Sequence, residues 1–141
     1  MRANRIQRIT IISALLLAST IVVHAVALDG TQWKVKVVPD KASAEKGAKT
    51  FNDEWTFADG KFSSTAMKLH GFEATSRIRL ETEETAVGEL REAEFQIEQF
   101  RATNDVAVWT GDIRGTNAVG GLQWKAKDRD DFLYDFTGTR E

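Results

Sequence analysis

The chain has 141 residues, enough for one domain, and its 21 acidic and 19 basic residues give a formal net charge of −2. It contains no Cys, which excludes disulfide bridges and thiol chemistry. The basic residues form neither the stripe nor the cluster that binding to nucleic acids or anionic membranes requires, so we expect neither partner.

Residues 1–27 have the pattern of a secretory signal peptide. Three arginines lie within the first eight residues, and an apolar run follows from Ile9 to Val23. Small residues in Ala25-Val26-Ala27 fit the specificity of signal peptidase, so we expect cleavage after Ala27 or, as a second choice, after Ala25. The alternative is a retained membrane anchor, although the apolar run is short for a span of about 20 residues.

Cleavage would leave one domain, residues 28–141, in the periplasm or outside the cell. The removed segment holds three Arg and no acidic residue, so the net charge of the mature chain becomes −5. All the aromatic residues lie in the mature part, so the fold has the material for a core without disulfides. We expect no stable membrane span after cleavage.

The first mature elements are a strand and a short helix. Trp33, Val35 and Val37 alternate with lysines, which is typical of a half-buried strand that ends at Pro39. Asp40 then has the features of a helix N-cap, with a helix over residues 41–46 and Gly47 as its C-terminal cap.

Asp59-Gly60 separates two alternating runs, which predicts a tight hairpin turn between strands 51–57 and 61–67. Alternation with a period of two also divides residues 106–136 into three strands separated by turns rich in Gly, Asp and Asn. For the acidic run Glu81–Glu84 there is an alternative to a strand, in which these residues begin a helix that continues to Leu90.

The complete reading is all-β, an eight-stranded antiparallel up-and-down barrel with a short helix after the first strand. A meander of this kind leaves exposed edges unless its first and last strands pair. The strands are expected near 32–38, 51–57, 61–67, 72–81, 91–99, 105–113, 118–126 and 132–140.

This pattern resembles the lipocalin-like, or calycin, barrels of small exported bacterial proteins, over roughly residues 30–140. Gly30-Thr31-Gln32-Trp33 is similar to the glycine-x-tryptophan signature of that family, with two residues here between Gly and Trp. Arg140 stands where such barrels often carry an Arg that packs over that Trp at the closed end. The hairpin that joins Trp109-Thr110-Gly111 to Gly121–Trp124 also resembles the late strands of avidin-type barrels. The resemblance implies a fold and a tendency to bind ligands.

Catalytic and metal-binding readings have little support in the sequence. His70 is the only mature His and has no partner base at a useful spacing. Ser63 and Ser64 lack the strand-to-helix elbow of an activated serine. The acidic run Asp128–Asp131 lacks the Gly and distal Glu of a calcium loop. We therefore expect no enzyme activity, no cofactor and no metal.

Large aromatic residues occupy positions that alternation places inside the barrel. An eight-stranded barrel is either just filled by its side chains or holds one small ligand, and the number of rings favours filling. A preformed pocket of about 300 Å³ or more would favour binding of a small apolar or amphipathic ligand, our first expectation. A filled interior would favour an interaction or structural module of the cell envelope. The interior candidates are Trp55, Phe57, Phe62, Phe95, Trp109, Trp124 and Tyr134, with Trp33 and Arg140 at the closed end.

Overall fold

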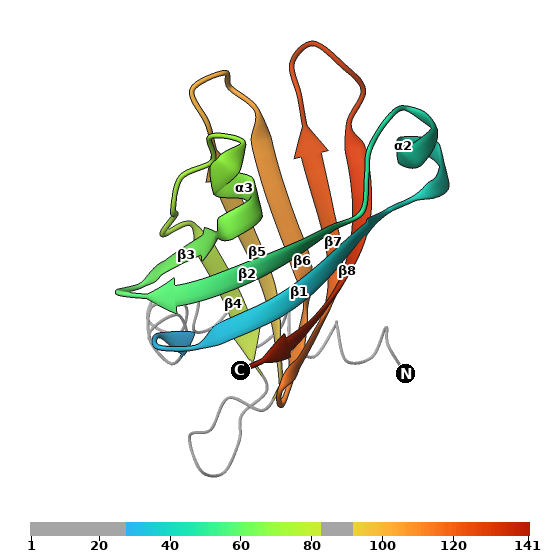
Figure 1. The fold of residues 1–141 in the computed structure, drawn as a ribbon. Helices are drawn as coiled ribbons and strands as arrows, with labels where there is room; N and C mark the ends of the chain where they lie inside the picture. The colour runs from blue at the N-terminus through green and yellow to red at the C-terminus, as the bar shows by residue number, and fades with distance from the viewer. Residues whose placement is uncertain (1–27, 83–91) are drawn as a thin grey trace.

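The computed structural model describes residues 28–82 and 92–141, so the expected signal peptide and most of the helix proposed from Glu81 to Leu90 lie outside the described residues. Eight strands and two short helices follow one another in the described ranges (Figure 1). The elements are β1 (Gln32–Pro39), α2 (Lys41–Glu45), β2 (Phe51–Ala58), β3 (Lys61–Ser64), α3 (Thr65–Leu69), β4 (Ile78–Thr82), β5 (Glu92–Phe100), β6 (Val106–Arg114), β7 (Asn117–Lys125) and β8 (Phe132–Arg140).

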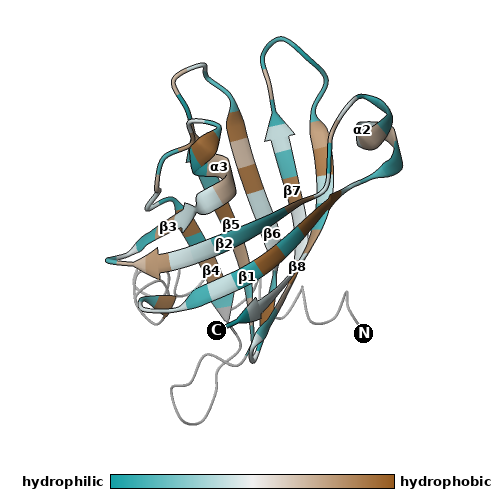
Figure 2. Cartoon of the chain, viewed as in Figure 1, coloured by the Kyte–Doolittle hydropathy of each residue, from teal (hydrophilic) through white to brown (hydrophobic). Residues whose placement is uncertain are grey.

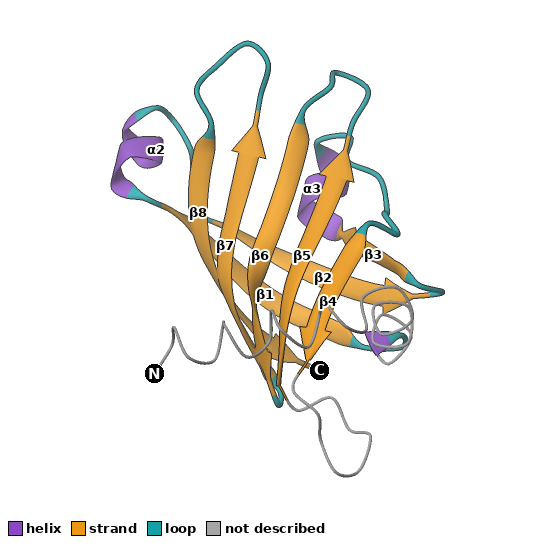
Figure 3. Ribbon diagram, turned by 180° about the vertical axis from the view of Figure 1, so that it is seen from behind, coloured by secondary structure: helices purple, strands orange, loops and turns teal. Residues whose placement is uncertain are grey.

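All eight strands form one antiparallel sheet in the order β3-β2-β1-β8-β7-β6-β5-β4. The first and last long strands pair, and Trp33 lies opposite Arg140 in their register. This confirms the expected pairing of the chain's two ends. The edges of the sheet are β3 and β4, and an isolated bridge joins Phe62 of β3 to Thr75 in the segment that precedes β4. The result is a nearly closed barrel, seen from behind in Figure 3, and the expected all-β fold is confirmed.

The local turn and cap predictions are also confirmed. The Asp40 carboxylate accepts a hydrogen bond from the Ser43 N–H at 2.7 Å and so begins α2, while Gly47 follows its end at φ +103°. Between β2 and β3, Asp59 and Gly60 have φ values of +54° and +72°, as a tight hairpin with two left-handed residues requires.

The strand expected over residues 61–67 is wrong in its second half. The chain leaves the sheet at Ser64, whose hydroxyl oxygen accepts the Met67 N–H at 3.1 Å and begins α3. A second acceptor, the Asp53 carboxylate from β2, binds the Ala66 N–H at 2.9 Å. These bonds satisfy N–H groups of the first turn that would otherwise be unpaired, and so they favour a helix over a continued strand.

The strand expected over residues 72–81 is shorter than predicted. β4 begins only at Ile78, whose N–H donates to the Ser76 carbonyl at 2.8 Å in a local turn. Before that turn, Thr75 contributes only its isolated bridge to Phe62. The connection from α3 therefore crosses one end of the barrel before the chain joins the sheet.

Burial follows the alternation of the strands, as the banding of Figure 2 shows. Along β1, Trp33, Val35 and Val37 are buried and the residues between them are largely exposed. Along β2, Asp53 breaks the apolar pattern because it is a carboxylate on the buried face, only 5% exposed. Among the described residues no helix is long and apolar enough to span a membrane.

Candidate functional site

The centre of the barrel is a cluster of aromatic rings. Trp55 is fully buried, and its ring centroid lies 5.0 Å from Phe136, 5.1 Å from Trp109, 5.3 Å from Phe62 and 6.1 Å from Phe95. The four pairs meet edge to face, the geometry that aromatic quadrupoles prefer. Each of these rings is less than 5% exposed. The structure thus brings together most of the interior candidates as mutually packed core residues.

Two of the proposed interior residues lie outside this cluster. Tyr134 packs against Phe51 and Phe132, with centroid distances of 5.6 and 6.4 Å. Trp124 lies near α3 and packs edge to face against Phe72 at 5.4 Å. The seven candidates therefore do not line one common space.

Polar groups within the core are mostly satisfied by one another. The Trp109 indole N–H donates to the Gln99 side-chain oxygen at 2.9 Å, and the Gln99 amide donates to the Glu73 carbonyl at 3.2 Å. Gln99 is fully buried, so these bonds offset the cost of placing an amide in the core. The Trp55 indole N–H differs, because it is buried and has no hydrogen-bond partner among the described residues.

Asp53 is the buried carboxylate beside α3. It accepts hydrogen bonds from the Ser64 hydroxyl and from the N–H groups of Ala66 (2.9 Å) and Glu54 (2.8 Å). Burial raises the pKa of Asp53 above its ordinary value, and these hydrogen bonds offset only part of the increase. The carboxylate thus caps α3 from a neighbouring strand at an electrostatic cost.

Two Arg side chains stack on a Trp ring, and this ring belongs to Trp124 rather than to Trp33. The Arg101 guanidinium lies 5.3 Å from the Trp124 ring and the Arg129 guanidinium lies 5.1 Å from it. Arg101 also pairs with Asp105, whose carboxylate accepts the Trp124 indole N–H at 3.3 Å. This cluster fastens the β5–β6 and β7–β8 loops together at one end of the barrel.

At Trp33 and Arg140 the structure shows backbone pairing between adjacent strands. The Trp33 ring is 1% exposed, and its N–H donates to the Thr31 hydroxyl at 3.2 Å. Arg140 is exposed, and its backbone N–H donates to the Thr116 carbonyl at 2.8 Å. Trp33 and Arg140 are close because they lie opposite one another in the register of β1 and β8.

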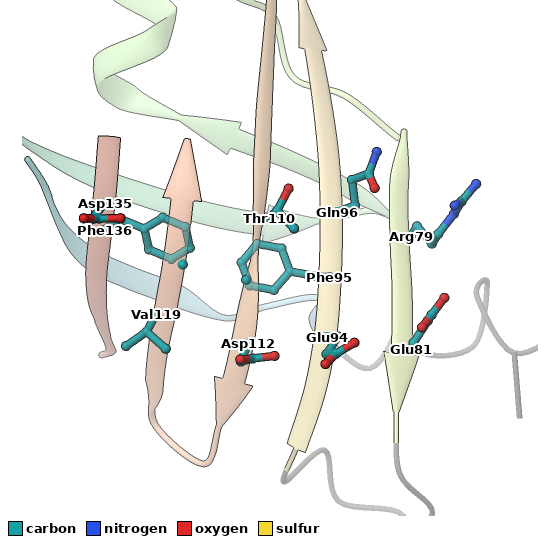
Figure 4. Close-up of a pocket in the computed structure, with 12 residues that line it drawn as sticks. Arg79, Glu81, Glu94, Phe95, Gln96, Thr110, Asp112, Val119, Asp135 and Phe136 are labelled. Carbon is teal, nitrogen blue, oxygen red and sulfur yellow. The ribbon is translucent and has the colours of Figure 1, made fainter. Parts of the chain in front are cut away.

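A groove of about 680 Å³ runs across the outer face of β4–β8 (Figure 4). Glu81, Glu94 and Asp112 lie directly opposite one another on three adjacent strands and form an acidic row. Figure 4 shows this row continuing to Val119 on β7. The three carboxylates make this part of the groove acidic. Arg79 is the basic residue that lines it.

The floor of the groove is thin because two glycines oppose each other there. Gly111 on β6 pairs with Gly120 on β7, and the rings of Phe95 and Phe136 lie behind them. A Cβ on Gly120 would come within 2.1 Å of the Thr110 carbonyl oxygen, so no side chain fits. The sequence did not predict the groove because most of its lining residues are outward-facing side chains on five strands, whereas the interior candidates were inward-facing; Phe95 is the interior candidate that also lines the groove.

Groups that could hold a metal ion are lacking within residues 28–82 and 92–141, where no three His, Asp or Glu side chains are suitably placed. His70, considered above as a base, packs its ring against Trp124 at 5.1 Å. The Ser64 hydroxyl donates to the Asp53 carboxylate and accepts the Met67 N–H at the start of α3.

Comparison of the chain with protein-family models, curated proteins and solved structures finds no match. The class that the fold defines is an eight-stranded antiparallel, nearly closed β-barrel. This architecture is compatible with a lipocalin-like fold, the resemblance noted in the sequence.

Proposed function

We propose that this chain is an exported, non-enzymatic binding module of the cell envelope, with a solid lipocalin-like barrel that contacts its partner through the outer surface. The observation that carries the proposal is the ring cluster around Trp55, which fills the middle of the barrel. A small apolar ligand would need that volume, because ligand pockets are typically about 300–1,000 Å³. The signal-peptide pattern of residues 1–27 supports export.

The outer groove supports a polypeptide partner with basic residues. Its walls carry Glu81, Glu94, Asp112 and Asp135, and Arg79 is the basic residue among them. Such an acidic surface attracts cationic segments and steers their approach. The apolar Val119, 43% exposed, adds a contact of the kind found at protein interfaces.

Site-specific photo-crosslinking in cells tests the outer surface. A photo-crosslinking amino acid at position 119, inside the groove, should capture one defined protein, and position 100 is the matched control. Phe100 is 42% exposed, nearly the same fraction as Val119, but it lies outside the groove. Equal capture at both positions, or no capture at either, would contradict a partner in the groove.

One observation favours the second candidate function, carriage of a small amphipathic molecule inside the barrel. The Trp55 indole N–H is buried beside the Asp53 carboxylate and makes no hydrogen bond of good geometry, so it is a donor that a ligand or a water molecule could satisfy. Native mass spectrometry of the purified protein separates the two functions. The solid-barrel proposal predicts the mass of the polypeptide alone, and one small molecule retained per barrel would overturn it.

A further inference from the structure

A second groove, separate from the acidic one, lies on the outer face of the barrel. It holds about 640 Å³ and runs over β8, β1 and β2, and none of its lining residues belongs to the groove across β4–β8. α3 forms one wall, because it continues from β3, the neighbour of β2 on the side away from β1 (Figure 1). We call it the lysine groove after Lys34 and Lys36, whose exposed side chains line it.

Neutral polar side chains flank Lys36 on both neighbouring strands. It lies opposite Thr137 of β8 and Asn52 of β2, and all three residues are exposed. A hydroxyl group, an ammonium group and an amide therefore form one row across three strands. Each of them can donate hydrogen bonds to a carboxylate.

Lys34 lies two residues from Lys36 on the same face of β1, opposite Thr139 of β8 and Glu54 of β2. Although Glu54 faces Lys34, neither lysine forms an ion pair with another residue of the described ranges. The lysine groove thus presents two ammonium groups whose charge is not neutralised by a close carboxylate of the described chain. This charge favours an anionic occupant.

Leu69 adds an apolar contact at the rim of the lysine groove. It is the last residue of α3 and is 85% exposed, more than any other large apolar side chain of the described ranges. An exposed apolar side chain beside charged groups is the mixture of contacts found at protein interfaces.

We propose that the lysine groove binds an extended acidic segment of another protein, in which two Asp or Glu residues are separated by one residue and lie close to an apolar residue. Side chains two residues apart in an extended chain lie on the same side, about 6.4–6.8 Å from one another. Lys34 and Lys36 have the same spacing along β1. A segment that follows β1 therefore places one carboxylate at each ammonium group and its apolar residue at Leu69.

The charge of the whole chain favours such a segment over other anions. The net charge is −2, so a phosphate-rich surface, such as a membrane or a nucleic acid, would be repelled by the protein around the groove. A single inorganic phosphate has no apolar part for Leu69. The proposal does not depend on the acidic groove, because the two grooves share no residue and attract partners of opposite charge.

Nuclear magnetic resonance titration of the purified protein tests the proposal. The probe is a synthetic peptide with Glu at two alternate positions and one Leu, and it should shift the amide signals of Lys34, Lys36 and Leu69 in a saturable way. We expect a dissociation constant on the order of 0.1–1 mM, because exposed charge pairs contribute little each. The Val119 signal, in the other groove, should not shift. Absence of saturable shifts at the lysine groove would overturn the proposal.

Two control peptides test the recognition of charge and spacing. One has Gln in place of both Glu, and the other has the two Glu adjacent, so that they point to opposite sides of an extended chain. Both should bind at least about threefold more weakly than the probe, and equal binding of either would contradict the proposed contacts. Vesicles of anionic phospholipid and inorganic phosphate are tested in the same way. Tighter binding of either than of the probe peptide would overturn the choice of a peptide.

Variants of the protein assign the binding to the two lysines. Lys34→Gln/Lys36→Gln should weaken binding of the probe by about fivefold or more. Lys61→Gln/Lys125→Gln is the matched control, because it removes the same charge at exposed positions of β3 and β7 outside the lysine groove, and it should change binding by less than about twofold. Equal losses in the two double variants would show a general effect of charge and overturn the site.

Leu69→Ser tests the apolar contact without disturbing the core, because the side chain is 85% exposed. It should weaken binding of the probe by about two- to fivefold and leave unchanged the weaker binding of a peptide that lacks Leu. A variant that binds both peptides as the original chain does would contradict the placement of the segment against α3.

Discussion

At the scale of single residues, Asp53 is the group whose protonation should be visible in stability. Burial raises the pKa of Asp53 above its ordinary value of 3.8, so the folded chain binds this proton more tightly than the unfolded chain does. The free energy of unfolding therefore decreases as the pH rises from 3.8 to the raised pKa, and the full penalty applies above it.

Asp53→Asn should remove this dependence while keeping the fold. The amide oxygen can still accept from Ala66, and the amide nitrogen can donate to the Ser64 hydroxyl. As the pH rises through the window, we expect the stability of the variant to increase relative to that of the original chain. Urea denaturation at a series of pH values measures the difference, and a difference that does not change with pH would contradict the assigned pKa direction.

Asp130→Asn is the control for this series. The nearby Lys46 ammonium, 2.9 Å away, lowers the pKa of Asp130, so its contribution to stability is lost as the pH falls. As the pH rises, the stability of Asp130→Asn relative to the original chain should therefore decrease, which is opposite to the change expected for Asp53→Asn. The decrease should be small because the Lys46 and Asp130 side chains are largely exposed.

Gly120 permits the close approach of β6 and β7 at the floor of the groove. The Cβ of Gly120→Ala would meet the Thr110 carbonyl oxygen at 2.1 Å and the Gly111 Cα at 2.5 Å, both parts of the backbone. Since the strands must separate to admit it, we expect a loss of about 1–3 kcal/mol in the free energy of unfolding. Thermal denaturation measures this loss, and an unchanged midpoint would show that the ladder is less closely paired here than in the structure.

Gly60 depends on backbone conformation alone. Its φ is +72°, and a Cβ there would meet no atom within 4 Å. Gly60→Val should cost about 1–2 kcal/mol because a branched residue is strained at positive φ. Gly60→Asn, which tolerates that conformation better, should cost clearly less in the same denaturation experiment. Equal costs for Val and Asn would argue against a strained left-handed residue.

At the scale of elements, α3 shows where prediction from the sequence failed. Ser64 followed by Ala66, Met67 and Lys68 is a helix start with good helix formers, and that signal was available. The prediction instead followed the alternation of the preceding residues and continued the strand to residue 67. The second cap, from Asp53, lies eleven residues away in sequence from Ser64 and is brought there only by the β2–β3 hairpin.

The pairing of β1 with β8 was predictable because each would otherwise leave an open edge. Truncation after Phe136 tests its contribution, since Thr137–Arg140 pair with β1 on one side and β7 on the other. We expect the melting temperature to fall by more than about 10 °C and Trp33 to become accessible to a fluorescence quencher.

Removal of Glu141 alone is the control for this truncation. It deletes one hydrogen bond, from the Glu141 N–H to the Gln32 carbonyl at 2.8 Å, and should change the melting temperature only slightly. If both truncations melted alike, the end of β8 would contribute little to the sheet.

At the scale of the whole molecule, alternation predicted the barrel and most of its buried rings, because inward and outward residues differ in chemistry. It could not predict how the rings meet. Trp55 contacts Phe136, Trp109 and Phe95 across the barrel, from strands that are far apart in sequence, and only the closed sheet defines these contacts. The seam between β3 and β4 was likewise unpredictable, because it depends on where α3 takes the chain out of the sheet.

The central claim is that the interior of the barrel is a filled core. Nuclear magnetic resonance of the purified protein under xenon pressure tests it most directly, because xenon enters apolar cavities of about 150 Å³. The indole N–H signals of Trp55 and Trp109, at the centre of the ring cluster, are the reporters. A filled core predicts that neither signal shifts in a saturable way as the xenon pressure rises. A saturable shift of the Trp55 signal would reveal an internal cavity and contradict the claim.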